Sequence, residues 1–298
     1  MKKFFKTLFI NLIIFVFLLG LIELFCIFNT FQEVKQNGYT FSKHLKNTIE
    51  SYKNDKYINI KDIRPKSIPR TKTNKQPLAV MGCSYAYGLH LKNEETLSAK
   101  LSELTNRTVI NLGINGASPR EILYIFSNEN IFKQLFKNEL DIEYVFYPYI
   151  SHHRFRLYNQ TVTFSSSPCF RKVNNKLEFY EQNKLIRSSQ LYKKFMELKY
   201  YTIKRKESLD LMFLYLKEIN KEMKKRLPNA TFVLLLYEDY LNEDWSELEK
   251  DGIIVIDIEK LANIHTKDPQ YTQSATDPHP NAKAWEIITP ALVKELNL

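Results

Sequence analysis

The chain has 298 residues, of which 44% are hydrophobic and 26% are charged, and its formal net charge is +10. This length can bury a sizeable core, and beyond an apolar N-terminal segment it fits one domain of about 220 residues better than two. The lysines are scattered among glutamates and no nucleic-acid-binding motif is present, so a basic surface facing an anionic membrane or envelope polymer is the simpler account of the charge.

The first predicted element is a membrane-spanning helix. Three lysines in the first six residues precede a largely apolar stretch from Leu8 to Phe28. A helix of about 20 apolar residues crosses a bilayer, and the lysines place its N-terminus in the cytoplasm and the rest of the chain in the periplasm or at the cell surface. A cleaved signal peptide is the alternative, but no small-x-small cleavage site is evident and residues 23–26 make a poor lipoprotein signal. We therefore expect residues 1–30 to be an uncleaved signal anchor.

A polar stretch, residues 31–75, follows this anchor. Lys, Asn and Thr are frequent in it and two prolines lie near its end, without helical or alternating hydrophobic period. We expect a tether that gives reach to a single domain formed by residues 76–298.

The domain opens with a short apolar strand and a turn of small residues. Residues 77–80 are Pro-Leu-Ala-Val, and Met-Gly-Cys-Ser-Tyr-Ala-Tyr-Gly follows as residues 81–88. Such a turn lifts one hydroxyl clear of a sheet, so Ser84 is the candidate nucleophile. Two alternatives stay open: Ser84 as a simple helix cap, and Cys83 as the nucleophile, although a small buried cysteine is the commoner fate.

A second strand and turn supply candidate oxyanion donors. Residues 108–112 form a short apolar run that predicts a strand, and residues 113–116 form the turn after it. A capped helix begins at Ser118. This pattern puts exposed backbone amides at the carboxyl edge of a parallel sheet, where the sites of open α/β folds lie. Gly113 can therefore donate to an oxyanion and Asn115 can add a side-chain donor, the alternative being a glycine needed only for the turn.

The third strand, residues 143–147, leads to the sequence Ser-His-His-Arg at residues 151–154. Neighbouring residues of an extended chain point in opposite directions, so we expect at most one of His152 and His153 to face the site. Arg154 is a candidate for binding a sugar carboxylate or a phosphate, with an ordinary surface role as the alternative.

An insertion at about residues 157–206 contains a predicted hairpin, residues 170–180, and an amphipathic helix, residues 188–206. The apolar stripe of this helix indicates core packing, with a flap over the site as the alternative. A long helix up to Arg226 and the apolar strands 231–236 and 253–256 then resume the strand–helix alternation. The fold class is therefore α/β, with a mostly parallel five-stranded sheet between two helical layers.

The last block, Asp277-Pro278-His279-Pro280-Asn281, lies before a final helix and offers an acid and a base in one loop. With Ser84 they supply the nucleophile, base and orienting carboxylate of an activated serine. Rival acids are Asp257, which has no histidine at short spacing, and Asp268, which follows its histidine. Solvated loop positions are the simpler expectation for both.

Three of these blocks resemble the SGNH/GDSL hydrolase superfamily, and the resemblance spans roughly residues 76–298. Residues 82–84 with Gly88 are similar to its first block, with a cysteine where aspartate is commoner; residues 111–116 look like the second block and residues 277–281 like the last. The resemblance implies a flavodoxin-like domain in which Ser84, His279 and Asp277 form a triad. It also implies an oxyanion hole lined by the amides of Ser84 and Gly113.

Two features depart from the family's pattern. The asparagine that a third block normally brings to the oxyanion has no clear match in residues 147–154, and the acid and base are two residues apart rather than three. The shorter spacing is similar to that of SGNH-like polysaccharide O-acetyltransferases.

The resemblance implies a membrane-anchored serine esterase that acts on O-acyl groups of an envelope glycan or lipid, with no metal or cofactor. With only seven glycines in the chain, a phosphate-binding Gly-rich loop is not expected. Two alternatives stay open. One is an envelope polysaccharide O-acyltransferase that works with a multispanning acyl-export partner, and the other is a carbohydrate-binding or scaffold module without catalysis.

Overall fold

The computed structural model describes residues 2–34, 74–136, 141–158, 168–181, 189–202, 205–238 and 243–298. A five-stranded sheet forms its centre, and each strand runs parallel to its neighbours. The strands are β1 (Leu78–Gly82), β2 (Val109–Gly113), β3 (Tyr144–Ile150), β6 (Thr231–Glu238) and β7 (Ile254–Asp257). The predicted five-stranded sheet is thereby confirmed.

The strand order is β2-β1-β3-β6-β7, which is the doubly wound order of flavodoxin-like sheets. Strands β1 and β2 end side by side, because Gly82 pairs with Gly113 in the register. The winding reverses between β1 and β3, and the crevice outside the carboxyl ends of the strands at such a point is where these sheets bind ligands.

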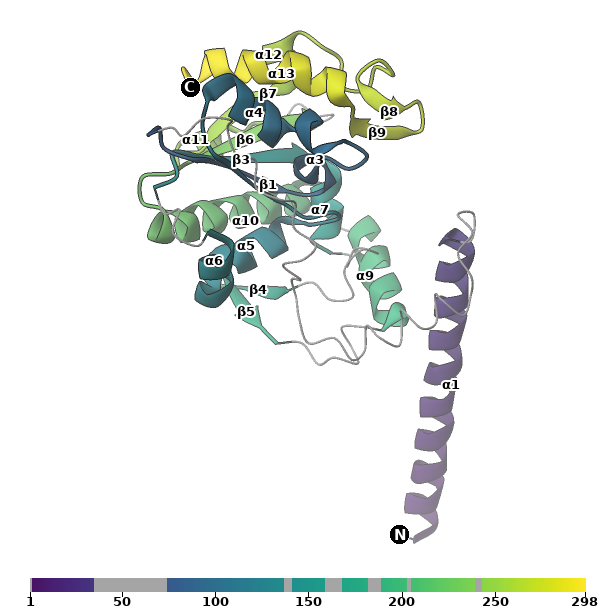
Figure 1. The fold of residues 1–298 in the computed structure, drawn as a ribbon. Helices are drawn as coiled ribbons and strands as arrows, with labels where there is room; N and C mark the ends of the chain where they lie inside the picture. The colour runs from purple at the N-terminus through teal and green to yellow at the C-terminus, as the bar shows by residue number, and fades with distance from the viewer. Residues whose placement is uncertain are drawn as a thin grey trace.

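Helices cover both faces of the sheet (Figure 1). One face carries α5 (Pro119–Ser127), α6 (Glu129–Phe136) and α10 (Arg205–Arg226), and the other carries α4 (Leu97–Thr105), α12 (Ile258–Ala262) and α13 (Ala282–Glu295). The short elements η3 (Asn93–Glu95) and α11 (Ser246–Glu249) lie in the connections. The expected three layers are therefore present.

Strand β1 is buried on both faces, as its uninterrupted apolar sequence predicts. Ala79 and Met81 join the core that includes residues of α5, α6 and α10, whereas Leu78 and Val80 join the core that includes residues of α4 and α13. Burial from both sides fixes the height and rotation of this strand, and with them the turn that follows it.

Three short elements gather at the carboxyl edge of the sheet (Figure 1). Helix α3 (Ser84–Tyr87) follows β1 and helix α7 (His152–Arg156) follows β3. The antiparallel pair β8 (Thr272–Ser274) and β9 (Asp277–Pro280) precedes α13. The segment expected as a loop around residue 277 is thus a strand of a small hairpin.

The insertion contains the predicted hairpin, which consists of β4 (Cys169–Val173) and β5 (Lys176–Tyr180). Its two turn residues, Asn174 and Asn175, have φ angles of 49° and 59°, as a tight two-residue hairpin turn requires. The predicted helix is also present as α9 (Gln190–Thr202). The expected core packing of its apolar stripe is wrong, because Phe195 and Leu198 are 60% and 65% exposed. The remainder of residues 157–206 lies partly outside the described residues.

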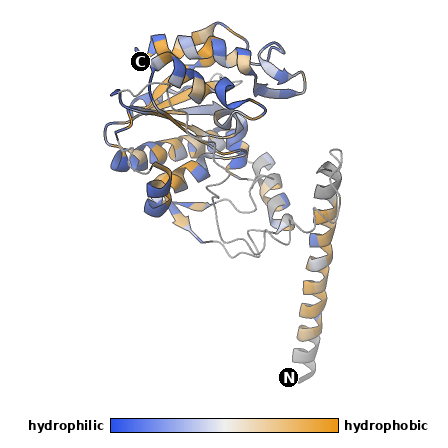
Figure 2. Cartoon of the chain, viewed as in Figure 1, coloured by the Kyte–Doolittle hydropathy of each residue, from blue (hydrophilic) through white to orange (hydrophobic). Residues whose placement is uncertain are grey.

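Helix α1 (Lys2–Val34) stands apart from the domain and approaches it next to α9 (Figure 1). Its segment Leu8–Phe28 is long and apolar enough to cross a membrane, and hydrophobic residues line it along its length (Figure 2). A signal sequence has the same properties. Most of the predicted tether, residues 35–73, lies outside the described residues.

Candidate active site

Ser84 lies at the sharp turn between β1 and α3. Gly82 ends the strand with a φ of 138°, a conformation that favours glycine, and Cys83 is the N-cap of the helix. Ser84 is therefore the first residue of α3 and is 2% exposed. The first hydrogen bond of this turn is made by Tyr87 N to Cys83 O, at 2.9 Å. The Ser84 N–H consequently precedes the helical hydrogen-bond ladder and points out of the helix end.

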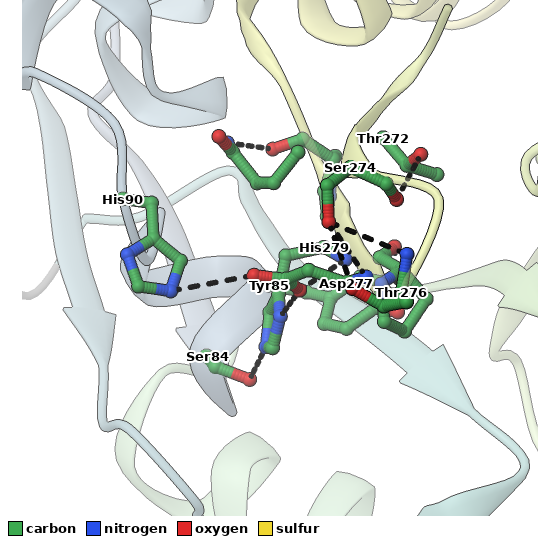
Figure 3. Close-up of polar contacts among 11 residues, drawn as sticks. Ser84, Tyr85, His90, Thr272, Ser274, Thr276, Asp277 and His279 are labelled. Atoms are coloured by element: carbon green, nitrogen blue, oxygen red, sulfur yellow. Dashed lines mark hydrogen bonds and ion pairs between the residues drawn. The ribbon is translucent and has the colours of Figure 1, made fainter. Parts of the chain in front are cut away.

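Ser84, His279 and Asp277 form a continuous chain of hydrogen bonds (Figure 3). The Ser84 Oγ lies 2.8 Å from His279 Nε2, and His279 Nδ1 lies 2.5 Å from Asp277 Oδ1. Because a carboxylate only accepts hydrogen bonds, the proton of neutral His279 resides on Nδ1, which leaves Nε2 to accept from the serine hydroxyl. The structure therefore brings the three expected residues into the order that an activated serine requires.

The hairpin that carries the acid and base is fastened on both sides. The Tyr85 hydroxyl, one residue after Ser84, donates to Pro278 O at 3.1 Å. The backbone N–H of Asp277 donates to Ser274 Oγ at 3.1 Å. Asn281, which caps α13, donates through Nδ2 to Thr272 O at 2.9 Å. The Tyr85 bond ties β9 to α3, and the other two bonds hold the β8–β9 hairpin together.

The Asp277 carboxylate keeps its charge through its hydrogen bonds. Partial burial raises the pKa of Asp277, but the hydrogen bonds from the His279 ring and backbone, with the charges of His279 and His90, outweigh it, and the net pKa lies below the usual value. Asp277 is therefore ionised near neutral pH, as the orienting acid of such a chain must be.

Gly113 packs directly against the turn that carries Ser84. A Cβ at this position would lie 2.2 Å from Tyr87 N and 2.5 Å from the carbonyl carbon of Ala86. The Gly113 N–H donates to the side chain of Asn111 at 2.8 Å, so it is already bonded. The expected oxyanion role of Gly113 stays a prediction that requires this bond to be shared, whereas its close packing on α3 is evident.

Asn115 follows the end of β2 and is half-buried. Within the part of the chain that the structure describes, its side chain makes no hydrogen bond. Its role as an oxyanion donor stays a prediction.

The residues of α7 differ from expectation. His153 is fully buried, with Nδ1 3.0 Å from the Tyr147 hydroxyl, and burial, then the charge of Arg156, holds its pKa well below the usual value. The Arg154 guanidinium lies 2.6 Å from Glu243 Oε1, with 7% and 4% of the two side chains exposed.

Arg154 is thus not the free surface cation that was expected to bind an anionic substrate, because a buried carboxylate already neutralises it. His153 is likewise a packed, neutral residue. His152, which has an exposed edge, stays the candidate of the pair for substrate contact; desolvation and the charge of Arg156 lower its pKa to about 4.

The rival acids serve as caps. Asp257 accepts from Lys260 N at the start of α12, and Asp268 accepts from Gln270 N, at 3.1 and 3.0 Å. His265 leaves 87% of its side chain exposed. Cys83 is fully buried behind the nucleophile turn. None of these residues joins the Ser84–His279–Asp277 chain.

One residue beside the site carries no sequence signal of its own. His90 lies in the loop after α3, and its Nε2 is 3.4 Å from Asp277 Oδ2. Only the tertiary fold brings it to the hairpin. Among the described residues, no group of three His, Cys, Asp or Glu side chains is placed to hold a metal ion.

No protein-family model matches the sequence, and no curated protein matches it at a significant level. Solved structures do resemble it. A protein of the G-D-S-L family from Desulfitobacterium hafniense DCB-2 has a TM-score of 0.44 and 11% identity, over 74% of this chain and 99% of its own.

Two further similar structures are enzymes by name. The acetyl xylan esterase Est2A from Butyrivibrio proteoclasticus has a TM-score of 0.43 and 10% identity, over 76% of this chain and 64% of its own. Phospholipase A1 from Streptomyces albidoflavus NA297 has a TM-score of 0.41 and 9% identity, over 74% of this chain and 98% of its own. The likeness to these structures is distant.

Proposed function

We propose that this protein is a serine esterase of the SGNH/GDSL type. The observation that carries the proposal is the hydrogen-bonded chain from Ser84 through His279 to Asp277. An unactivated serine hydroxyl is a weak nucleophile, and a histidine held in one tautomer by a carboxylate is the usual means of activating it. The residues come from segments separated by 195 positions, so a chance local contact is a poor explanation for their alignment.

In the reaction, His279 Nε2 removes the Ser84 proton while Oγ forms a bond to the ester carbonyl carbon. The tetrahedral intermediate collapses, the bond to the leaving alcohol breaks, and His279 returns the proton to that alcohol. Water then attacks the acyl-serine while His279 takes a proton from the water. The bond between the acyl carbon and Oγ breaks, His279 returns the proton to Oγ, and release of the carboxylic acid restores Ser84. Asp277 balances the positive charge that His279 carries in both halves of the cycle.

The oxyanion needs donors close to Ser84. The Ser84 N–H at the first position of α3 is the donor that the local backbone supports best. Gly113 and Asn115 are proposed as further donors, the former by sharing its bond to Asn111. Loss of one such donor typically costs about 100- to 1,000-fold in kcat.

The proposed substrate is an O-acylated glycan or lipid of the cell envelope. The apolar helix α1 supports a membrane anchor, and the lysines at its start favour a cytoplasmic N-terminus with the domain on the other side. A domain anchored in this way acts on substrates close to the non-cytoplasmic surface of the membrane that holds its anchor.

The test is hydrolysis of p-nitrophenyl acetate by the full chain purified in detergent. We expect turnover by the wild type and a loss of at least about 1,000-fold for Ser84→Ala and for His279→Ala. Matched controls are His265→Ala and Asp268→Asn, which remove a histidine and an acid outside the chain and should leave the rate unchanged. Equal inertness of wild type and variants, also toward a serine-reactive phosphonate, would refute the esterase and favour a binding module.

The acyl acceptor is decided by product analysis. If the acyl-serine forms and a sugar hydroxyl accelerates its decay to an acylated sugar, the protein is a transferase that shares the same triad. If only water accepts the acyl group, hydrolysis is the function. Deletion in the living cell gives the complementary result, because loss of an esterase raises acylation of the polymer and loss of a transferase lowers it.

A further inference from the structure

His90 lies against the outer oxygen of the Asp277 carboxylate. Its Nε2 is 3.4 Å from Asp277 Oδ2, while Asp277 Oδ1 accepts the bond from His279 Nδ1. The two imidazole rings have their centroids 6.1 Å apart and their planes at 83°. One carboxylate therefore lies between two imidazoles, each of which contacts a different oxygen (Figure 3).

The backbone brings His90 to this place in an unfavourable conformation. His90 has a φ of 66°, in the left-handed region that residues with a Cβ occupy uncommonly, although histidine is found there more often than most. The turn that forces it begins at Gly88, the left-handed C-cap of α3, and closes through a bond from Leu91 N to Gly88 O at 3.1 Å. Strain of this kind persists where surrounding structure imposes it and is concentrated at functional sites.

The contact of His90 adds a third connection between α3 with its following loop and the β8–β9 hairpin. The first two are Ser84 to His279 and the Tyr85 hydroxyl to Pro278 O, which span 195 and 193 residues of sequence. The contact of His90 differs from both, because it acts on the orienting acid itself.

Asp277 needs such a contact because its side chain is 30% exposed. Its Oδ1 already accepts from both the ring and the backbone N–H of His279, at 2.5 and 3.1 Å. Rotation of the carboxylate toward water would weaken the bond that fixes the His279 tautomer. The His90 ring, which lies against Oδ2, opposes that rotation through this contact.

We propose that His90 is a positioning residue that holds the plane of the Asp277 carboxylate and thereby the orientation of His279. This inference rests on the proposed esterase function, and it assigns the loop after α3 a part in the acid–base machinery. His90 acts through Asp277 and contacts neither Ser84 nor the substrate in this proposal.

The kinetic test uses His90→Gly, which removes the ring and relieves the backbone strain together. We expect kcat for p-nitrophenyl acetate to fall about tenfold with KM unchanged, and added imidazole to restore it, since 55% of the His90 side chain is exposed and its place can be refilled. Asn106→Gly is the matched control, because Asn106 has a φ of 54° at the end of α4 and makes the same backbone change away from the site.

A second measurement needs no substrate and so separates this inference from the proposed function. The proton between His279 Nδ1 and Asp277 should give a far-downfield NMR signal in the wild-type full chain. We expect His90→Gly to broaden it and imidazole to restore it. An unchanged signal and unchanged kcat would overturn the role of His90; so would a loss of activity that imidazole does not rescue with the signal intact, which would mark His90 as merely structural.

Discussion

The buried side chain of Asn111 holds the turn of Ser84 against strand β2. Its Nδ2 donates to Ala86 O at 3.0 Å and to Ser98 Oγ at 2.9 Å, while its Oδ1 accepts from Gly113 N. One amide group thus joins β2, α3 and α4, and all its bonds are sheltered from water. Because a buried amide is costly to leave unpaired, this arrangement resists displacement of the nucleophile turn.

Gly113 should not tolerate even one methyl group. In Gly113→Ala the new Cβ would overlap the backbone of Tyr87 and Ala86, so α3 must move away from β2. We expect a loss of about 2–3 kcal/mol of unfolding free energy and a fall in esterase rate larger than the fall in stability explains. Thermal unfolding and p-nitrophenyl acetate turnover measure the two effects.

The control for this change is Gly252→Asn. Gly252 has a φ of 75° and open space around it, and Asn adopts that conformation at little cost, so stability should stay within about 0.5 kcal/mol. A Gly113→Ala variant as stable as this control would contradict the close packing described here.

Single residues were predictable from sequence where their chemistry is rare. A serine in a glycine turn and an acid and base two residues apart identify Ser84, Asp277 and His279 as candidates, and the structure joins them. The pairing of Arg154 with Glu243 was not predictable, because the partners are 89 residues apart and neither has a distinctive neighbourhood. The same holds for His90, which reaches Asp277 only through the tertiary fold.

At the scale of elements, α7 is an anchor for the end of β3 rather than an open edge of the site. Its His153 contacts Tyr147 of β3, and its Arg154 contacts Glu243 in the segment before α11. Both contacts are buried. The element therefore ties two connections of the sheet together beside the crevice.

The ion pair of α7 makes a specific prediction. Arg154→Met leaves Glu243 buried without its partner and should cost about 3–5 kcal/mol, whereas the double variant Arg154→Met/Glu243→Leu should recover most of that loss. Chemical denaturation measures both. Where the variants remain folded, KM should match that of the wild type; a large rise in KM in the stable double variant would restore Arg154 as a substrate-binding residue.

The same helix predicts sensitivity to acid. The pKa of His153 lies well below its usual value in the folded state because the ring is buried, so between about pH 6.5 and that lower pKa the unfolded chain binds more protons than the folded one. The contribution of His153 to the free energy of unfolding is fully present above about pH 6.5. It falls as the pH is lowered, by up to about 2 kcal/mol at pH 5.

Thermal unfolding at pH 7 and pH 5 tests this dependence. His153→Gln should be less stable than the wild type at pH 7, because it disturbs the contact with Tyr147, but it should lose less stability on acidification. His265→Gln, at an exposed position, is the matched control. An equal acid loss in wild type and His153→Gln would assign the sensitivity to other groups.

Apolar runs in the sequence predicted the five central strands, because a strand that is buried on both faces must consist mostly of apolar residues. The hairpin β8–β9 was not predicted from the sequence, and the composition of β9 explains why. Strand β9 reads Asp-Pro-His-Pro, and proline, which lacks an N–H, normally argues against a strand. A two-stranded pair with few inter-strand hydrogen bonds accommodates both prolines. The hydrophobic periodicity of the sequence does not reveal such a strand.

At the scale of the whole chain, the apolar helix α1 is joined to the insertion. The Glu23 carboxylate accepts from Ser189 Oγ and from Leu191 N, both at 2.8 Å, at the start of α9. At its other end, α9 places Tyr201 against Phe155 of α7, with ring centroids 6.2 Å apart. Helix α1, the insertion and α7 are therefore connected through direct contacts.

Removing the carboxylate should loosen this connection without releasing the chain from the membrane. In Glu23→Leu, hydrogen exchange at Leu191 should rise at least about tenfold, because its N–H loses the carboxylate that accepts from it, while detergent should still be required for extraction. Ser189→Ala leaves the acceptor of Leu191 N in place but removes the Oγ that accepts from Tyr192 N, so it should raise exchange at Tyr192 more than at Leu191. Unchanged exchange in Glu23→Leu would show that α9 is held by other contacts.

The distance in sequence between Ser84 and His279 also sets an order of events in the life of each molecule. Ser84 is synthesised first, and His279 follows 195 residues later. At ribosomal speeds of about 5–20 residues per second, roughly 10–40 s separate the two. On the proposed mechanism, the nascent chain holds a serine without its base during that interval, and we expect a chain truncated before β9 to be inactive however well its sheet has folded. In the proposed esterase, synthesis of β9 is therefore the step that completes the site.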